Sequence, residues 1–394
     1  MRSLLVGLLI AGCSGSPSGE TGTRFITIGV DALPTLQAVT RAQIVEQDGE
    51  VAVVAIDAGD LETLSEKMHD AHHRCGGFIL HDDVVDAHLF AHTSIKPAPF
   101  KYSIDRPEVV GQVLPLLSET NILGTITELQ SMKNRYYRSA SGAAASDWLR
   151  DRWKSFTHRA DVTFELFDHG YPQKSVIMTI PGTGRANEVV VIGGHLDSIA
   201  PGGSDSRAPG ADDDASGIAT LSEVARALLA ADFRPERTIM FMGYAAEEVG
   251  LRGSLSIAKA FRERGVNVVG VLQLDMTNYQ GSAADIWIIT DFTSSPQNAF
   301  LTALIDTYVG ATWGFDKCGY ACSDHAAWHR NGFAASMPFE SRSREMNRAI
   351  HTKNDTLERS SHNASHAIKF ARLGAAYAIE LAKGALPTTR LAGL

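Results

Sequence analysis

The chain has 394 residues, enough for one large domain and a smaller one, and its apolar and charged fractions of 44% and 21% are those of an ordinary globular protein. The formal net charge of −9, without a cluster of Lys and Arg, argues against a surface that binds nucleic acid. No apolar stretch reaches the roughly 20 residues that are needed to span a bilayer.

Residues 1–13 have the pattern of a signal peptide. A single positive charge, Arg2, precedes a short apolar core, and small residues lead to Cys13. The ending IAGC resembles a bacterial lipoprotein signal, in which the cysteine carries the lipid; a plain signal peptide is the alternative. Residues 14–23 are typical of a flexible tether. We therefore expect an exported chain, in the periplasm or at the outer membrane or cell surface, whose link to a membrane is a lipid on Cys13.

The next segment, residues 24–95, is predicted to form a small α+β domain. The apolar run from Glu50 to Asp57 predicts a strand, and residues 76–80 predict another. Between them, residues 60–74 have the apolar spacing of a helix with one buried face.

Histidines are concentrated in this small domain. Six of the fourteen lie between His69 and His92, and their spacing matches no zinc motif. A solvated, histidine-rich surface is the simpler interpretation, and metal binding is the alternative. Two prolines then mark residues 96–102 as a linker.

Residues 103–386 are predicted to form the main domain, followed by a C-terminal tail at residues 387–394. Helices are expected at residues 126–137, 142–156, 214–230, 254–264, 296–309 and 365–385. Strands are expected at residues 162–169, 174–182, 188–195, 238–246, 268–276, 285–290 and 334–340. Apolar strands alternating with helices indicate an α/β fold with a mixed, mostly parallel central sheet and helices on both faces.

Histidine, aspartate and glutamate side chains follow several of these strands. Taken singly, each is an ordinary cap or turn residue. Because the carboxyl ends of parallel strands meet at one edge of a sheet, at least five carboxylates and a histidine would converge there. Packed like charges need cations, and a mixed imidazole and carboxylate set suits two zinc or similar divalent ions that share one carboxylate. The set is His195, Asp197, Asp212, Asp213, Asp214, Glu247, Glu248 and Asp275.

Seven motifs together resemble those of the bacterial leucyl aminopeptidase family, which are secreted two-zinc aminopeptidases. They occur in the family's order between about Tyr102 and Ala385: GGHLDS, PGADDDASG, GYAAEEVGLRGS, LQLDMTNYQGS, CGYACSDHAAWH, MPFES and IHTKNDTL. The resemblance implies the zinc aminopeptidase fold. The preceding segment, around HRCGGFILH, resembles the propeptide of the family's precursors, which implies a zymogen.

The resemblance implies a role for each residue that matches a motif. His195 and Asp275 would hold one Zn²⁺, Glu248 and His351 would hold the second, and Asp213 would bridge the two. Two further residues would be catalytic: Glu247 as general base, and Asp197 as the acid that orients the imidazole of His195. The family also has a cis peptide bond at the position of Asp213 and Asp214.

The substrate side of the site is implied in the same way. Cys318 and Cys322, which are close enough in sequence to bridge, resemble the family's disulfide, and Tyr320 lies between them near the substrate. Cys75 would stay unpaired. An apolar pocket would be formed by Met276, Ile289, Met337, Phe339 and Ile350, with ordinary core packing as the alternative for each.

The implied activity is the release of N-terminal, apolar residues from peptides with a free amino terminus, by a monomer in which two zinc ions activate water. Ser343 and Met346 stand where relatives have aromatic residues, which leaves the preference for leucine open. The alternatives are a carboxypeptidase, dipeptidase or glutaminyl cyclase of the same fold, and a non-catalytic ectodomain. Cleavage in the linker would separate the enzyme from Cys13.

Overall fold

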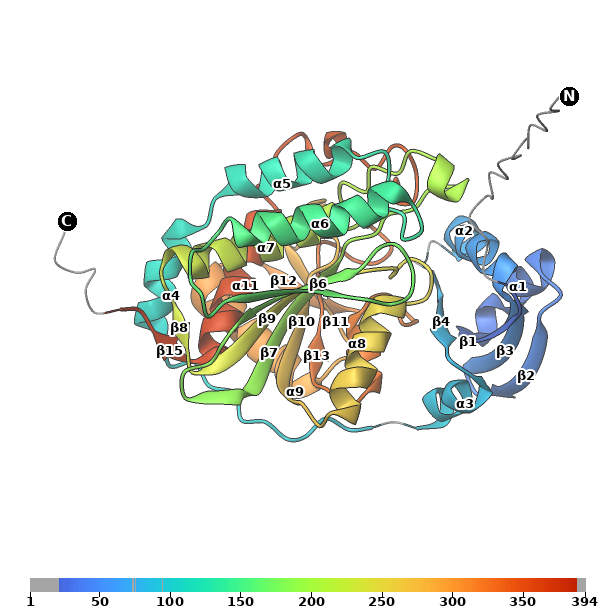
Figure 1. The fold of residues 1–394 in the computed structure, drawn as a ribbon, viewed down its shortest axis with the longest axis horizontal. Helices are drawn as coiled ribbons and strands as arrows, with labels where there is room; N and C mark the ends of the chain where they lie inside the picture. The colour runs from blue at the N-terminus through green and yellow to red at the C-terminus, as the bar shows by residue number, and fades with distance from the viewer. Residues whose placement is uncertain (1–20, 73, 75, 94, 388–394) are drawn as a thin grey trace, which may run out of the picture.

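The computed structural model describes residues 21–72, 74, 76–93 and 95–387. They form a small N-terminal unit, blue at the right of Figure 1, and a large α/β unit. The predicted signal peptide with Cys13, most of the tether, Cys75 and the tail from residue 388 lie outside the described residues.

The N-terminal unit is a four-stranded antiparallel sheet in the order β2-β3-β1-β4, covered by helices. Helices α1 and α2 pack on the face that carries Ile26 and Ile28, while Phe90 of α3 packs on His81 at the opposite face. The predicted α+β character agrees with this arrangement. The elements are β1 (Thr23–Gly29), α1 (Leu33–Val39), β2 (Gln43–Asp48), β3 (Val51–Asp57), α2 (Leu61–His72), β4 (Phe78–His81) and α3 (Val84–His92).

The large unit is built on a six-stranded sheet in the order β13-β10-β7-β9-β6-β5. The four strands from β13 to β9 are parallel, and β6 and β5 continue the sheet in antiparallel pairs. The predicted mixed, mostly parallel sheet is therefore confirmed. Its strands are β5 (Thr163–Phe167), β6 (Ser175–Ile180), β7 (Arg185–His195), β9 (Arg237–Tyr244), β10 (Asn267–Gln273) and β13 (Ala335–Ser336).

Helices cover both faces of this sheet (Figure 1). The larger core lies under α4 (Pro107–Val113), α5 (Glu119–Ser131), α6 (Ala140–Lys154), α7 (Ala215–Ala230), α9 (Ser295–Leu304) and α11 (Ala367–Ala382). The opposite face is covered by α8 (Arg252–Glu263) and α10 (His325–Arg330). Among the described residues, no single helix has the length and apolar composition to cross a bilayer, although the bent pair of residues 107–116 and 119–131 meets those two criteria together.

Two sequence expectations are wrong in detail. The expected strand 334–340 is split: β13 joins the central sheet, whereas β14 (Pro338–Phe339) pairs with β11 (Ile286–Ile289) in a separate sheet that also contains β12 (Trp313–Asp316). One continuous apolar run thus serves two sheets. The helix expected to reach residue 137 ends at Ser131, because the next residue, Met132, is extended.

Short elements complete the chain. The pair β8 (Arg234–Pro235) and β15 (Gly384–Ala385) joins the last helix to the sheet. Single helical turns lie at Val30–Ala32, Ala58–Asp60, Leu114–Leu116, Gly203–Asp205, Ile305–Val309 and Leu357–Ser360.

Candidate active site

The ends of three parallel strands place the site. His195 is the last residue of β7 and pairs in register with the last residue of β9, Tyr244. Glu247 and Glu248 are the third and fourth residues after the end of β9, and Asp275 is the second residue after the end of β10. The predicted strand-end residues therefore meet at one edge of the sheet, and all are buried.

Asp213 lies between two histidines that come from distant parts of the chain. Its Oδ1 atom is 2.9 Å from Nε2 of His195, and its Oδ2 atom is 3.1 Å from Nε2 of His351. Asp275 lies 3.6 Å from the first imidazole, and Glu248 lies 2.6 Å from the second. The two triads of candidate ligands, His195–Asp213–Asp275 and Asp213–Glu248–His351, therefore share one carboxylate.

The loop before α7 is fixed by carboxylates on both sides. The peptide bond between Asp213 and Asp214 is cis, as the resemblance implies. Asp214 accepts hydrogen bonds from the backbone nitrogens of His195 and Gly217, which ties the start of α7 to the end of β7. Asp355 accepts from the backbone nitrogen of Asp213 at 3.1 Å. This loop therefore has little freedom to move Asp213.

Asp197 couples the first imidazole to the glutamate pair. Its two carboxylate oxygens accept hydrogen bonds from the backbone nitrogens of Glu247, at 3.0 Å, and Glu248, at 3.1 Å. One of those oxygens also lies 3.4 Å from Nδ1 of His195, on the side of the ring away from Asp213. Asp197 can therefore orient the imidazole, which is the role the resemblance implies.

The electrostatics of this buried cluster favour bound cations. Burial alone would lower the pKa of His195, but Asp275 and neighbouring carboxylates raise it well above its usual range. Burial raises the pKa of Glu248 to about 7 and the pKa of Asp355 to about 8. Arg135 is fully buried near several of these carboxylates, among them Asp214 and Asp355, and its guanidinium donates hydrogen bonds to backbone carbonyls.

Glu247 has an unusual environment for a carboxylate. It is 1% exposed, and neither of its oxygens accepts a hydrogen bond from a residue that the structure describes. Burial raises its pKa well above the usual range. An imidazole and carboxylate donor set fits divalent transition-metal ions, and a carboxylate left without a donor beside it is free to accept a proton from water.

The predicted apolar pocket residues also come together beside the ligands. Met276, Ile289, Met337, Phe339 and Ile350 form one buried cluster with Cys322 and Met346, and Cys318 and Tyr320 pack against it. A pocket of about 490 Å³ opens here, next to Asp275. Ile289 and Ile350 lie behind its wall. The Cys318–Cys322 disulfide is present in the structure and shapes one side of the pocket.

The N-terminal unit lies against this site. The Ser65 hydroxyl of α2 donates a 2.8 Å hydrogen bond to the backbone carbonyl of Glu248. The ring of His69, one turn further along, lies with its centroid 4.5 Å from that of His351. The predicted histidine-rich surface is therefore not uniformly solvated, since His69 packs on a candidate ligand and His81 is buried.

The same unit also reaches into the pocket. His72 and Arg74 line it, and the guanidinium carbon of Arg74 lies 5.0 Å from the ring centroid of Tyr320. The pocket as described is thus partly formed by residues that the sequence assigns to a separate domain.

Sequence reasoning did not assign three buried residues of the site's surroundings. Asp324 and Asp355 lie inside two of the quoted motifs, so their position was an available signal. Arg135 had none, because its partners are backbone carbonyls of Leu196, Pro209 and Gly210 that only the fold brings close.

Comparisons with known proteins agree with the motifs at the level of the family. Residues 175–376 match the model of peptidase family M28. Leucine aminopeptidase 1 of Arthroderma otae is 35% identical over 319 residues, which are 76% of this chain and 84% of that relative. The crystal structure of LapB from Legionella pneumophila has a TM-score of 0.81 at 28% identity, covering 92% of this chain and 100% of LapB. The crystal structure of the LapA aminopeptidase of Legionella pneumophila has a TM-score of 0.80 at 29% identity, covering 93% of this chain and 100% of LapA.

Proposed function

The chain belongs to peptidase family M28 and is an aminopeptidase, and we propose that it releases apolar N-terminal residues from peptides with two zinc ions in its active site. The observation that carries the proposal is the position of Asp213, whose two carboxylate oxygens face two different imidazoles. His195 and Asp275 would hold one ion, Glu248 and His351 would hold the other, and Asp213 would contact both.

The bound ions would polarise the peptide carbonyl and make water acidic enough to be deprotonated near neutral pH. The chain's own residues supply the rest. Glu247 would accept the proton of the attacking water and deliver it to the departing amine, since its oxygens accept no other hydrogen bond among the described residues. Asp197 would hold the Glu247 backbone and the His195 ring in place.

The apolar cluster behind the pocket would select the first side chain. Met276, Met337 and Phe339 present apolar surface to the pocket, and burying a leucine-sized side chain there contributes about 1.5–3 kcal/mol. Met346 fills part of this cluster, so we expect flexible thioether packing and tolerance of methionine as well as leucine.

The test uses the protein after its N-terminal unit has been removed by proteolysis. It combines metal analysis with substrate assays. We expect about two zinc ions per chain, hydrolysis of leucyl and methionyl anilides, and no hydrolysis of the N-acetylated substrates. Equal cleavage of the N-acetylated substrates, or cleavage from the carboxyl end, would support the carboxypeptidase or dipeptidase alternative instead.

We further propose that the full-length chain is an exported zymogen. The contacts of Ser65 with Glu248 and of His69 with His351 support a blocked site, because substrate would need the space that α2 fills. The irregular segment between α3 and α4, residues 95–106, is the natural place for cleavage. If Cys13 is lipidated, that cleavage would release a soluble enzyme from the membrane.

Fractionation with N-terminal sequencing tests the export proposal. A soluble, active form starting near residue 100 supports release after cleavage. A full-length lipidated form with full activity, and no shorter form, would contradict it.

A further inference from the structure

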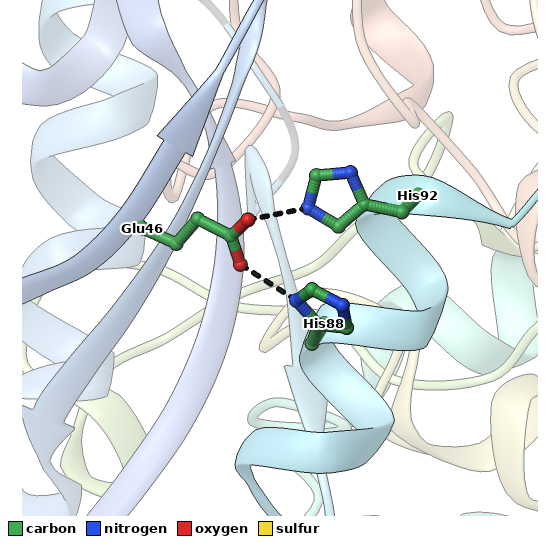
Figure 2. A group of neighbouring side chains, drawn as sticks. All are labelled: Glu46, His88 and His92. Atoms are coloured by element: carbon green, nitrogen blue, oxygen red, sulfur yellow. Dashed lines mark hydrogen bonds and ion pairs between the residues drawn. The ribbon is translucent and has the colours of Figure 1, made fainter.

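A second group of candidate metal ligands lies on the N-terminal unit, outside the active site. Figure 2 shows Glu46 of β2 facing His88 and His92 of α3. Glu46 Oε2 lies 2.7 Å from His88 Nδ1, and Glu46 Oε1 lies 2.8 Å from His92 Nε2. The three candidate ligand atoms all lie within 4.8 Å of one another, which is compact enough for one ion to reach all of them.

The helix presents both imidazoles on one side. His88 and His92 are four residues apart, the spacing that places side chains above each other on a helix. Their ring centroids are 4.5 Å apart. Asp83 caps the start of α3 by accepting from the backbone nitrogen of Asp86, so the pair sits on a defined element of nine residues.

A β-bulge turns the carboxylates toward this helix. The pairing of β2 with β3 shifts between Ile44 and Glu46, which leaves Val45 as an extra residue. Ile44 packs into the core under α1 and α2, so simple alternation would send Glu46 to that face as well. The extra residue instead directs Glu46, and two residues later Asp48, to the face that α3 covers.

Asp48 supplies a further feature of a metal site. Its Oδ2 atom lies 3.3 Å from His92 Nδ1, while His92 Nε2 faces Glu46. A metal-bound histidine almost always donates its other ring nitrogen to a carboxylate or carbonyl, which fixes the ring and its tautomer.

We propose that Glu46, His88 and His92 bind one zinc ion or a similar transition-metal ion, with Asp48 orienting His92. Two imidazoles and one carboxylate favour zinc over Mg²⁺ and Ca²⁺, which prefer oxygen ligands. The His88 side chain is 54% exposed, so the remaining coordination positions face water and the ion can enter from solvent. The site is independent of the catalytic ligands.

The bound ion would join the edge strand β2 to the last turn of α3. His92 is the final residue of α3, and the irregular segment that leads to the large unit follows it. Binding would therefore stabilise the N-terminal unit and hold the helix end beside that segment.

The test is equilibrium dialysis of the full-length chain, already loaded with zinc at its active site, against micromolar zinc at pH 7.5. We expect the wild type to bind about one zinc ion more per chain than either His88→Gln or His92→Gln. Asp48→Asn should keep the site but weaken it by about 10- to 100-fold, as changes to such supporting carboxylates do. Zinc should also raise the unfolding temperature of the wild type more than that of His88→Gln.

The matched control is His158→Gln, which changes an exposed histidine of the large unit. This variant should take up as much zinc as the wild type. Equal zinc uptake by the wild type, His88→Gln and His92→Gln would overturn the proposal, and so would a loss of uptake in His158→Gln, because binding would then be a property of any surface histidine. Comparable uptake of Mg²⁺ at the same concentration would also contradict a site built on imidazoles.

Discussion

The hydroxyl of Ser65 lies 2.8 Å from the backbone carbonyl oxygen of Glu248, and both residues are buried. This bond joins the middle of α2 to the residue that our proposal makes a metal ligand. It is shielded from water, so removing the hydroxyl leaves a buried carbonyl without its partner. Such a change costs about 1–2 kcal/mol.

Ser65→Ala should therefore loosen the N-terminal unit and raise the activity of the uncleaved chain. A loss of about 1–2 kcal/mol corresponds to a roughly 5- to 30-fold larger population of the open form. The measurement is leucyl anilide hydrolysis by the full-length chain, before and after proteolytic removal of the unit. Thr63→Ala, on the exposed side of the same helix, is the control and should change nothing. Equal activity of the intact and cleaved wild type would contradict the zymogen proposal.

Replacing Glu247 by Gln should lower kcat by about 10²–10⁴-fold, the usual contribution of a general base. Gln has nearly the same shape but cannot accept the proton from water. Because Glu247 belongs to neither triad of candidate ligands, the metal content should stay at the wild-type value. Metal analysis beside the kinetic assay separates the two effects, and parallel loss of metal and activity would show that the residue is a ligand instead.

Asp213→Asn, unlike the Glu247 variant, should lose bound metal as well as activity. One carboxylate serves both triads, so its replacement by an amide should reduce occupancy at both metal positions and abolish activity as a consequence. Elemental analysis after dialysis against a weak chelator gives the occupancy. Asp70→Asn on the surface of α2 is a charge-matched control. If Asp213→Asn keeps two tightly bound ions, Asp213 does not bridge them.

The sequence predicts the central sheet and the meeting of the strand-end residues at one edge, because both depend on local patterns. The apolar runs end just where His195, Glu248 and Asp275 begin, and parallel strands bring those ends together. Two kinds of feature escape such reasoning. Arg135 is bound by carbonyls from a distant loop, and the place of α2 over Glu248 joins residues 183 positions apart. Neither leaves a periodic signal.

The bulge in β2 is a further example. Alternation along the strand predicts that Glu46 and Ile44 share a face, and the single extra residue Val45 reverses this. The sequence shows His88 and His92 four residues apart, but it cannot show their carboxylate partner, since the partner depends on pairing between strands.

The disulfide between Cys318 and Cys322 should matter more for substrate binding than for stability. Closing so short a loop contributes only roughly 2 kcal/mol to the free energy of unfolding in the chain-entropy model. Tyr320 lies within the closed loop and lines the pocket. Reduction and alkylation should therefore raise KM clearly, while the denaturation midpoint should change little. Mass spectrometry of the native protein should find no free thiol at either position, and two free thiols there would contradict the prediction.

The N-terminal unit should lose stability in acid as Asp86 becomes protonated. The hydrogen bond from His81 lowers the pKa of Asp86 from 3.8 to about 2. A carboxyl whose pKa is lower in the folded state stabilises that state above its unfolded pKa, and the effect is lost as the pH falls through the folded value. The contribution should therefore be complete above about pH 4 and disappear as the pH falls toward 2. The shift corresponds to at most about 2.5 kcal/mol, and because Asp86 is 30% exposed we expect on the order of 1 kcal/mol.

Asp86→Asn should lower the free energy of unfolding by that amount at pH 7 and by almost nothing at pH 2. Urea titrations at the two pH values measure it, with Asp70→Asn as the exposed control. An equal deficit of Asp86→Asn at both pH values would show that the effect comes from packing and not from the charge.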